Sequence, residues 1–296
     1  MRTLSTSTGA KLFATGFTVG PIVDSLHNQC LLRYDVLPIS LEWPAALQQN
    51  QQVLGDIASI SDGYPYFFCS SWIVPPLLGF AYVVLGGLLP RILETIQESF
   101  KKRDREEIST TVSPGMKAPL LASSPSSSSS QQLRIRAILA VTTTAMIIKL
   151  SEFLETHPGI FGTSSEPVSV PVLLMILACL SQWALLDGSL GAFFLATVTA
   201  IGGPLAELPF VGHGAWTYIE SAADYFPLQN FAIAESNNLL SQISQALFGT
   251  SNYQDLALSS ITGPCYFAVA MDAIALGRWF DTSESATLPP SSSAKR

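Results

Sequence analysis

Long apolar runs without charged residues alternate with polar segments along this chain. About 20 apolar residues in a helix cross the roughly 30 Å of a bilayer's hydrocarbon core, so such runs predict membrane-spanning helices. Three runs of eighteen or more uncharged residues occur: Phe67–Leu89, Val168–Leu186 and Gly188–Ala206. A fourth run, Leu256–Gly277, is interrupted by one acid, Asp272.

Two weaker runs complete the pattern. Leu12–Leu32 contains Asp24 and His27, and the shorter Ala137–Ser151 contains Lys149 near one end. Long cationic side chains near a span end can reach the interface, so Lys149 does not exclude a span.

The distribution of charge tests whether all six runs cross the membrane. With a cytoplasmic N-terminus, thirteen of the fifteen Lys and Arg residues fall on the cytoplasmic side. The loops on the far side carry twelve acids and no Lys or Arg: Tyr34–Tyr66, Glu152–Pro167 and Glu207–Asp255. Because cytoplasmic loops are enriched in Lys and Arg, the sequence predicts an all-α bundle of six transmembrane helices with both termini cytoplasmic.

This topology divides the chain into four segments. Residues 1–90 hold two helices and their loop, 91–136 a cytoplasmic linker, 137–280 four helices and 281–296 a disordered tail. Within the linker, Arg91–Phe100 carries apolar residues on one helical face and basic residues follow, which fits an amphipathic helix on the membrane surface or a solvated helix end. Ser109–Gln132 is rich in Ser and Pro and is expected to form no packed core.

Composition narrows the class of function. Only 12% of residues are charged and the mean hydropathy is +0.36, which argues against a soluble enzyme. The net charge of −7 argues against a nucleic-acid partner, leaving the lipid bilayer as the first partner. No spacing of a catalytic triad, phosphate loop or metal site occurs, so we expect no enzyme activity, cofactor or metal.

The ionisable residues inside the spans need partners or a purpose, because charge in a bilayer is costly. Asp24 and His27, three residues apart, share a helix face that could bind a metal, relay a proton or form a hydrogen-bonded pair. Asp272 could reach the interface or pair with Lys149. A small transporter or lipid carrier that uses these four residues is one functional hypothesis.

Asp187 lies at the tight turn between two uncharged spans. A carboxylate there could cap the N-terminus of the following helix. Alternatively, this lone charge at a cytoplasmic turn could contact a partner protein.

The second span reads S-S-W-I-V-P-P-L-L-G-F-A-Y-V-V-L-G-G-L-L-P and resembles the corresponding segment of the Insig (insulin-induced gene) proteins. The resemblance extends in order over roughly Phe67–Phe280. Its matching positions include Trp72, Pro75, Pro76, Gly79, Trp183, Asp187, Phe194 and Phe267.

The resemblance implies a non-enzymatic regulator of the endoplasmic reticulum membrane. Insig proteins bind oxysterols among their helices, retain the sterol-sensing escort Scap and recruit HMG-CoA reductase for degradation. The resemblance therefore implies a sterol ligand and a Scap-like or HMG-CoA reductase-like partner. It also implies that the partner contacts Asp187 and the nearby Trp183. The implied sterol region comprises Trp72, Pro75, Pro76, Gly79, Phe194 and Phe267.

The sequence also departs from the family. The turn after Asp187 is shorter, Val170 replaces a glutamine of the sterol-binding region, and the serine-rich linker and the loop at 220–255 are additions. Self-association remains open. An organellar membrane is the alternative location, since Met1–Lys11 resembles the start of a transit peptide.

Overall fold

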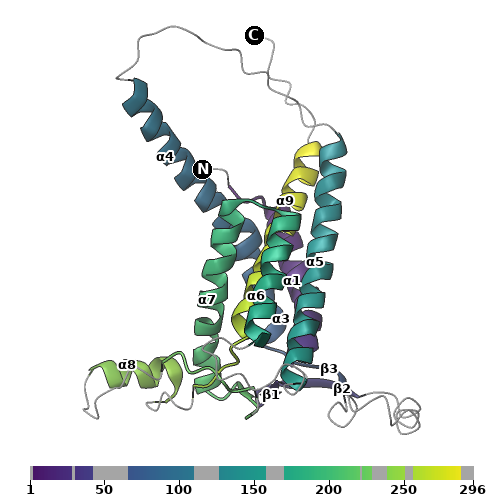
Figure 1. Cartoon of the computed structure of the whole chain (residues 1–296), viewed down its shortest axis with the longest axis vertical. Coiled ribbons are helices and arrows are strands. Elements are labelled where there is room, and N and C mark those ends of the chain that lie inside the picture. The colour runs from purple at the N-terminus through teal and green to yellow at the C-terminus, as the bar shows by residue number, and fades with distance from the viewer. Residues whose placement is uncertain are drawn as a thin grey trace.

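Long helices lying side by side form the body of the protein (Figure 1). The computed structural model describes residues 3–28, 31–42, 66–109, 127–157, 170–220, 222–228, 239–250 and 256–287. The helices in these ranges are α1 (Thr6–Asn28), α3 (Val74–Tyr82), the π-helical η1 (Val83–Leu88), α4 (Leu89–Ser109), α5 (Ser127–Thr156), α6 (Val170–Leu186), α7 (Leu190–Gly212), α8 (Leu239–Phe248) and α9 (Thr262–Thr287).

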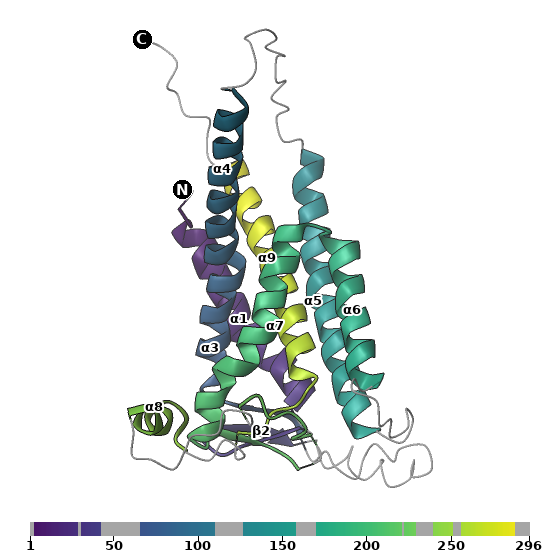
Figure 2. The same ribbon diagram turned by 60° about the vertical axis from the view of Figure 1, so that its left-hand side comes forward.

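Two short antiparallel ribbons lie at one end of this bundle (Figures 1 and 2). The first pairs β1 (Leu32–Tyr34) with β4 (Trp216–Tyr218), and the second pairs β2 (Pro38–Glu42) with β3 (Tyr66–Ser71). The ribbons join the segments that follow α1 and α7 and precede α3. They correct the expectation of an all-α fold.

Helix α9 lies at the centre of the bundle. It contacts α1, η1, α5, α6 and α7. Small residues on α9, including Ala268 and Ala273, are fully buried. Small side chains let helix backbones approach closely, which is how helices associate inside membranes.

The closest approach lies where η1 crosses α9. A Cβ atom at Gly277 would lie 1.9 Å from the carbonyl oxygen of Gly86, and one at Gly86 would lie 2.2 Å from that of Ala273. Only glycine fits at these two positions.

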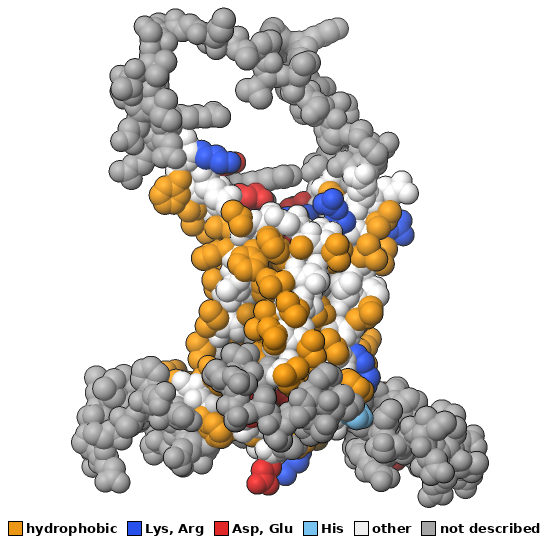
Figure 3. Space-filling model, in the orientation of Figure 1, with side chains coloured by type: hydrophobic (Ala, Val, Ile, Leu, Met, Phe, Trp, Pro, Cys, Tyr) orange, Lys and Arg blue, Asp and Glu red, His pale blue; other side chains and the backbone are white. Residues whose placement is uncertain are grey.

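Three described helices are long and apolar enough to cross a membrane. They are Val74–Lys102, Ser130–Thr156 and Leu190–Gly212; the apolar helix Val170–Leu186 is shorter. Hydrophobic side chains cover the long middle part of the face seen in Figure 3, and charged side chains gather toward its ends. The protein is therefore a mostly helical, multi-pass membrane protein.

The beginning of α1 and the end of α9 lie at the same end of the bundle (Figure 1). The Thr8 hydroxyl donates a hydrogen bond to Glu284 at 3.0 Å, and the Lys11 ammonium lies 6.0 Å from the centre of the Phe280 ring. Nearby, Arg91 forms an ion pair with Asp281. These contacts place both described ends of the chain on one side of the bundle.

Several predicted boundaries shift. Helix α5 begins at Ser127, inside the segment expected to form no packed core, and α9 continues to Thr287, beyond the predicted start of the tail at 281. Helix α4 continues from η1 and projects beyond the other helices, leaning away from them at its end (Figure 1). The remaining linker, 110–126, and the tail, 288–296, lie outside the described residues.

The crossing of η1 and α9 is testable. We expect Gly277→Ala to lower the free energy of unfolding by about 1 to 3 kcal/mol, because the new methyl group collides with the Gly86 carbonyl. Gly202→Ala is the matched control, since a Cβ there has no neighbour within 4 Å. Thermal melting of the detergent-solubilised protein measures both, and equal melting temperatures would contradict the assigned crossing.

Candidate functional site

A cavity of about 80 Å³ lies among α1, α3, α5, α7 and α9, toward the ribbon end of the bundle. Its polar side chains come from distant parts of the chain. A second cavity of about 80 Å³ shares Asp24, Leu78, Glu207 and Tyr266 with it and is also lined by the β1–β4 ribbon. The first cavity, called here the acidic cavity, is lined by Gly20, Val23, Asp24, His27, Leu78, Tyr82, Ile148, Glu207, Thr262, Cys265, Tyr266 and Val269.

The Asp24 carboxylate accepts hydrogen bonds from two elements of the ribbon end. The Tyr34 hydroxyl donates to Oδ2 at 2.6 Å, and the Ser70 hydroxyl donates to the same oxygen at 2.9 Å. These bonds join α1 to β1 and β3.

Glu207 holds a similar position on α7. The Tyr266 hydroxyl donates to Oε1 at 2.6 Å and the Tyr218 hydroxyl to Oε2 at 2.9 Å. Thr262 Oγ1 lies 3.2 Å from the Tyr218 hydroxyl. Hydrogen bonds of this kind are required for a polar group inside a bundle, because an unpaired buried carboxylate is costly.

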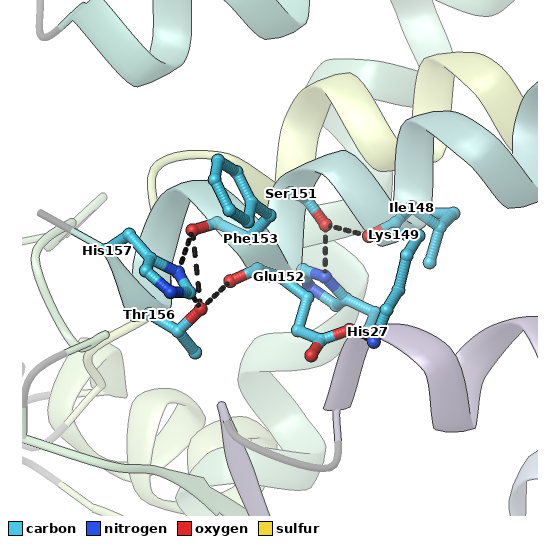
Figure 4. A network of polar contacts seen from close by, with 8 residues as sticks. All are labelled: His27, Ile148, Lys149, Ser151, Glu152, Phe153, Thr156 and His157. Carbon is cyan, nitrogen blue, oxygen red and sulfur yellow. Dashed lines mark hydrogen bonds and ion pairs between the residues drawn. The ribbon is translucent and has the colours of Figure 1, made fainter. Parts of the chain in front are cut away.

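His27 lies beside these carboxylates but contacts a different helix. Its Nδ1 lies 2.7 Å from Ser151 Oγ on α5, and Ser151 donates its own proton to the Ile148 carbonyl at 2.6 Å (Figure 4). The ring is 6% exposed, and its Nε2 has no hydrogen-bond partner among the described residues. Asp24 and His27 thus line one cavity while making separate hydrogen bonds.

The other two intramembrane charges lie elsewhere. Lys149 forms an ion pair with Glu152 one helical turn away, and its side chain is 59% exposed (Figure 4). Asp272 is fully buried and accepts a hydrogen bond from the Tyr82 hydroxyl at 3.0 Å. The structure contradicts both alternatives for Asp272, reaching the interface and pairing with Lys149, because its carboxylate is buried beside Tyr82 of α3 and Lys149 pairs with Glu152 of its own helix.

A second candidate site is the turn between α6 and α7. Asp187 forms an ion pair with Arg278 of α9, and its Oδ1 accepts from the Ser189 backbone N–H at 2.9 Å. Trp183 Nε1 donates to the Ser189 carbonyl at 2.9 Å. Gly188, with φ +66°, occupies the left-handed region that permits this tight turn. The turn thus brings Trp183 and Asp187 together.

Ser189, not Asp187, caps α7. Its backbone is extended and its hydroxyl accepts from the Ala192 N–H at 3.3 Å. The alternative of Asp187 as the N-cap was wrong because the turn is two residues longer than that reading assumed.

The residues of the implied sterol region do not gather in one place. Trp72 is 63% exposed and Phe194 is 56% exposed, whereas Phe267 is buried and packs edge-on against the Phe193 ring. Pro75 and Gly79 are buried and Pro76 is partly buried on α3, and Gly79 packs against Phe13 of α1. None of these six residues lines the acidic cavity.

Glu207, Tyr218 and Tyr266 are site residues that the sequence pattern did not predict. Glu207 was read as the first loop residue after a span ending at Ala206, yet α7 continues to Gly212. The apolar residues after Glu207 were the available signal, because they continue the helical pattern past Pro209. Among the described residues, no group of three or more His, Cys, Asp or Glu side chains could hold a metal ion.

The bundle of long apolar helices, around a mostly apolar cavity with a few polar side chains, defines a multi-pass helical membrane protein. The profile of the insulin-induced protein (INSIG) family matches residues 7–279. Since this match covers most of the chain, the protein belongs to the Insig family.

A solved structure shares the fold. The crystal structure of a cross-linked MvINS trimer has a TM-score of 0.52 and 16% sequence identity, with 98% of this chain and 100% of that chain covered. At this identity, the likeness concerns the fold alone. No curated protein matches this chain at a significant level.

The hydrogen bonds to Glu207 give a testable energy. Tyr266→Phe removes one donor from a carboxylate held inside the bundle, so we expect the free energy of unfolding to fall by about 1 to 3 kcal/mol. Tyr225→Phe is the control, because that ring is 46% exposed and does not line the cavity. Melting curves in detergent compare the two, and equal losses of stability would contradict the role of Tyr266.

Proposed function

We propose that this protein is a regulator of sterol or lipid synthesis, rather than an enzyme, that binds a sterol-like lipid and retains or recruits a sterol-sensing membrane partner. It crosses the endoplasmic reticulum membrane six times with both termini in the cytoplasm. The partner resembles Scap or HMG-CoA reductase in having a sterol-sensing domain. Membership of the Insig family supports this class of function.

The acidic cavity is the observation that carries the lipid-binding proposal. Its walls combine apolar side chains such as Val23, Leu78 and Val269 with hydrogen-bond acceptors on Glu207 and His27. A sterol is mostly apolar and carries a hydroxyl donor, so its polar end matches this lining. A lipid that stabilises one arrangement of α1, α3, α7 and α9 would change the surface offered to a partner, which is linkage between two sites.

The turn at Asp187 supports the partner-binding proposal. Arg278 pairs with the Asp187 carboxylate and covers it, so the Asp187 side chain is 7% and the Arg278 side chain 41% exposed; Leu185 and Leu190 of the same turn are 81% and 78% exposed. Exposed apolar side chains around a fixed charge suit contact with another membrane protein.

The transporter hypothesis receives less support. A transport pathway would need its ionisable residues along one route, but only Asp24 and His27 of the four line the acidic cavity. Lys149 lies at the exposed edge of α5, and Asp272 is bonded to Tyr82.

Sterol binding is the first test. We expect the purified full chain to bind labelled 25-hydroxycholesterol saturably, and Val269→Trp to abolish binding by filling the cavity. Val198→Trp, at an exposed position of α7, should bind as the wild type does. Saturation binding to immobilised protein measures this, and unchanged binding by the Val269 variant would place the ligand elsewhere.

Partner capture is the second test. Tagged protein is purified from native membranes with and without 25-hydroxycholesterol, and co-purifying proteins are identified by mass spectrometry. We expect the sterol to increase recovery of a polytopic sterol-sensing protein, and Asp187→Ala to lose that recovery. Arg278→Gln frees the carboxylate without removing it, so it should reduce capture less if Asp187 itself contacts the partner. If recovery of such a protein changes neither with sterol nor with Asp187→Ala, the proposed recruitment of a sterol-sensing partner is refuted.

A further inference from the structure

The acidic cavity contains an excess of hydrogen-bond acceptors over donors. Its hydroxyl donors are already committed to other groups. Tyr266 donates to Glu207 and Tyr82 to Asp272. Tyr218 gives its proton to Glu207, so the proton of Thr262 is the one shared at their 3.2 Å contact. The weakly donating thiol of Cys265 is the remaining hydrogen source in the lining.

His27 adds a free acceptor because of its tautomer. The Ser151 hydroxyl donates its one proton to the Ile148 carbonyl, so its oxygen can only accept a hydrogen bond from His27. The proton of the neutral imidazole therefore lies on Nδ1, and Nε2 carries a lone pair. This Nε2 is buried and has no partner among the described residues.

Glu207 has further accepting capacity. A carboxylate offers about four lone-pair positions, and each oxygen of Glu207 receives one described tyrosine hydroxyl. The Asp24 carboxylate adds a second negative charge to the lining. Among the described residues that line the cavity, none is Lys or Arg.

We propose that this cavity recognises the protonated amine of a single-chain amphiphile, a proposal that rests on the cavity being a lipid site. A neutral alcohol brings one donor and no charge. A primary ammonium brings three donors and a positive charge, which meets the acceptors of Glu207 and His27 together with the field of Asp24. Hydrogen bonds between a cationic donor and a carboxylate are also stronger than neutral ones.

The available space fits this assignment. About 80 Å³ corresponds to roughly two to three water molecules at the ~30 Å³ that each occupies in the liquid, which is enough for an ammonium group. The neighbouring cavity that shares Asp24 and Glu207 reaches Leu77, which is 39% exposed on α3. The hydrocarbon chain would leave along this apolar side. A single metal ion is the less suitable cation, because no three acidic, His or Cys side chains of the described residues meet closely enough.

Two probes with the same 16-carbon hydrocarbon chain, one an amine and one an alcohol, separate the effect of head-group charge from that of hydrophobic contact. The full-length protein is immobilised in a neutral maltoside detergent, and saturation binding is measured separately for labelled hexadecylamine, hexadecanol and 25-hydroxycholesterol. We expect hexadecylamine to bind about tenfold more tightly than hexadecanol, or more, as hydrogen bonds to charged groups predict. Equal affinities for amine and alcohol would overturn the inference.

The binding of 25-hydroxycholesterol, measured in parallel, distinguishes the proposed sterol site from the proposed amine site. Sterol binding without preference for the amine would leave the proposed function standing and overturn only the amine inference. Amine preference without sterol binding would support the amine inference and contradict a sterol ligand.

Glu207→Gln tests the charge directly, because it keeps the side chain's size and removes the carboxylate. We expect it to weaken hexadecylamine binding about tenfold and hexadecanol binding clearly less, because the amide oxygen of Gln can still accept from a hydroxyl but carries no charge. Glu155→Gln is the control: that carboxylate accepts from Ser259 at 2.8 Å outside the cavity lining. An equal loss for both probes in the Glu207 variant would overturn the inference. If that variant fails to fold, the wild-type comparison of the two probes decides.

Discussion

Helix α9 packs against five neighbouring elements, and small residues make that contact close enough to bring polar side chains together in the interior. At Gly86 and Gly277 the backbones of η1 and α9 nearly touch. This crossing places α9 between α1 and α7, so Tyr266 reaches Glu207 and Cys265 lies near His27. Without it, the acidic cavity would lose one of its walls. Because lipid tails are as apolar as the helix surfaces, the hydrophobic effect does not drive helices together inside a bilayer, and close packing of this kind has to hold the bundle together.

Three carboxylates inside the bundle, those of Asp24, Glu207 and Asp272, each accept hydrogen bonds from other elements of the fold. Asp24 links α1 to both ribbons, Glu207 links α7 to β4 and α9, and Asp272 links α9 to α3. Such bonds satisfy polar atoms that water cannot reach. They also define which elements would move together on ligand binding, since a lipid bound at Glu207, as proposed, would act on α7, α9 and β4 at once.

Much of the helical arrangement follows from hydropathy, since helices form at or around each run of apolar residues. The side-chain contacts between different helices were harder to predict, because spacing along one helix shows which residues share a face but not which helix lies opposite. The interface and Lys149 were the two alternatives for Asp272, yet its partner is Tyr82 of α3. Glu207 was missed because the apolar count stopped at the charge, although α7 continues past it. The turn at Asp187 was found from the sequence, but its partner Arg278 comes from a helix 91 residues later.

The proposed binding of a lipid's polar end in the acidic cavity, between α1, α3, α7 and α9, can be seen in an experimental structure of the full chain in lipid nanodiscs, for example by cryo-electron microscopy with a bound antibody fragment. We expect elongated lipid density whose head contacts Glu207 and His27 Nε2. A cavity containing only water, or closed by its own side chains in the presence of lipid, would show that no lipid binds there.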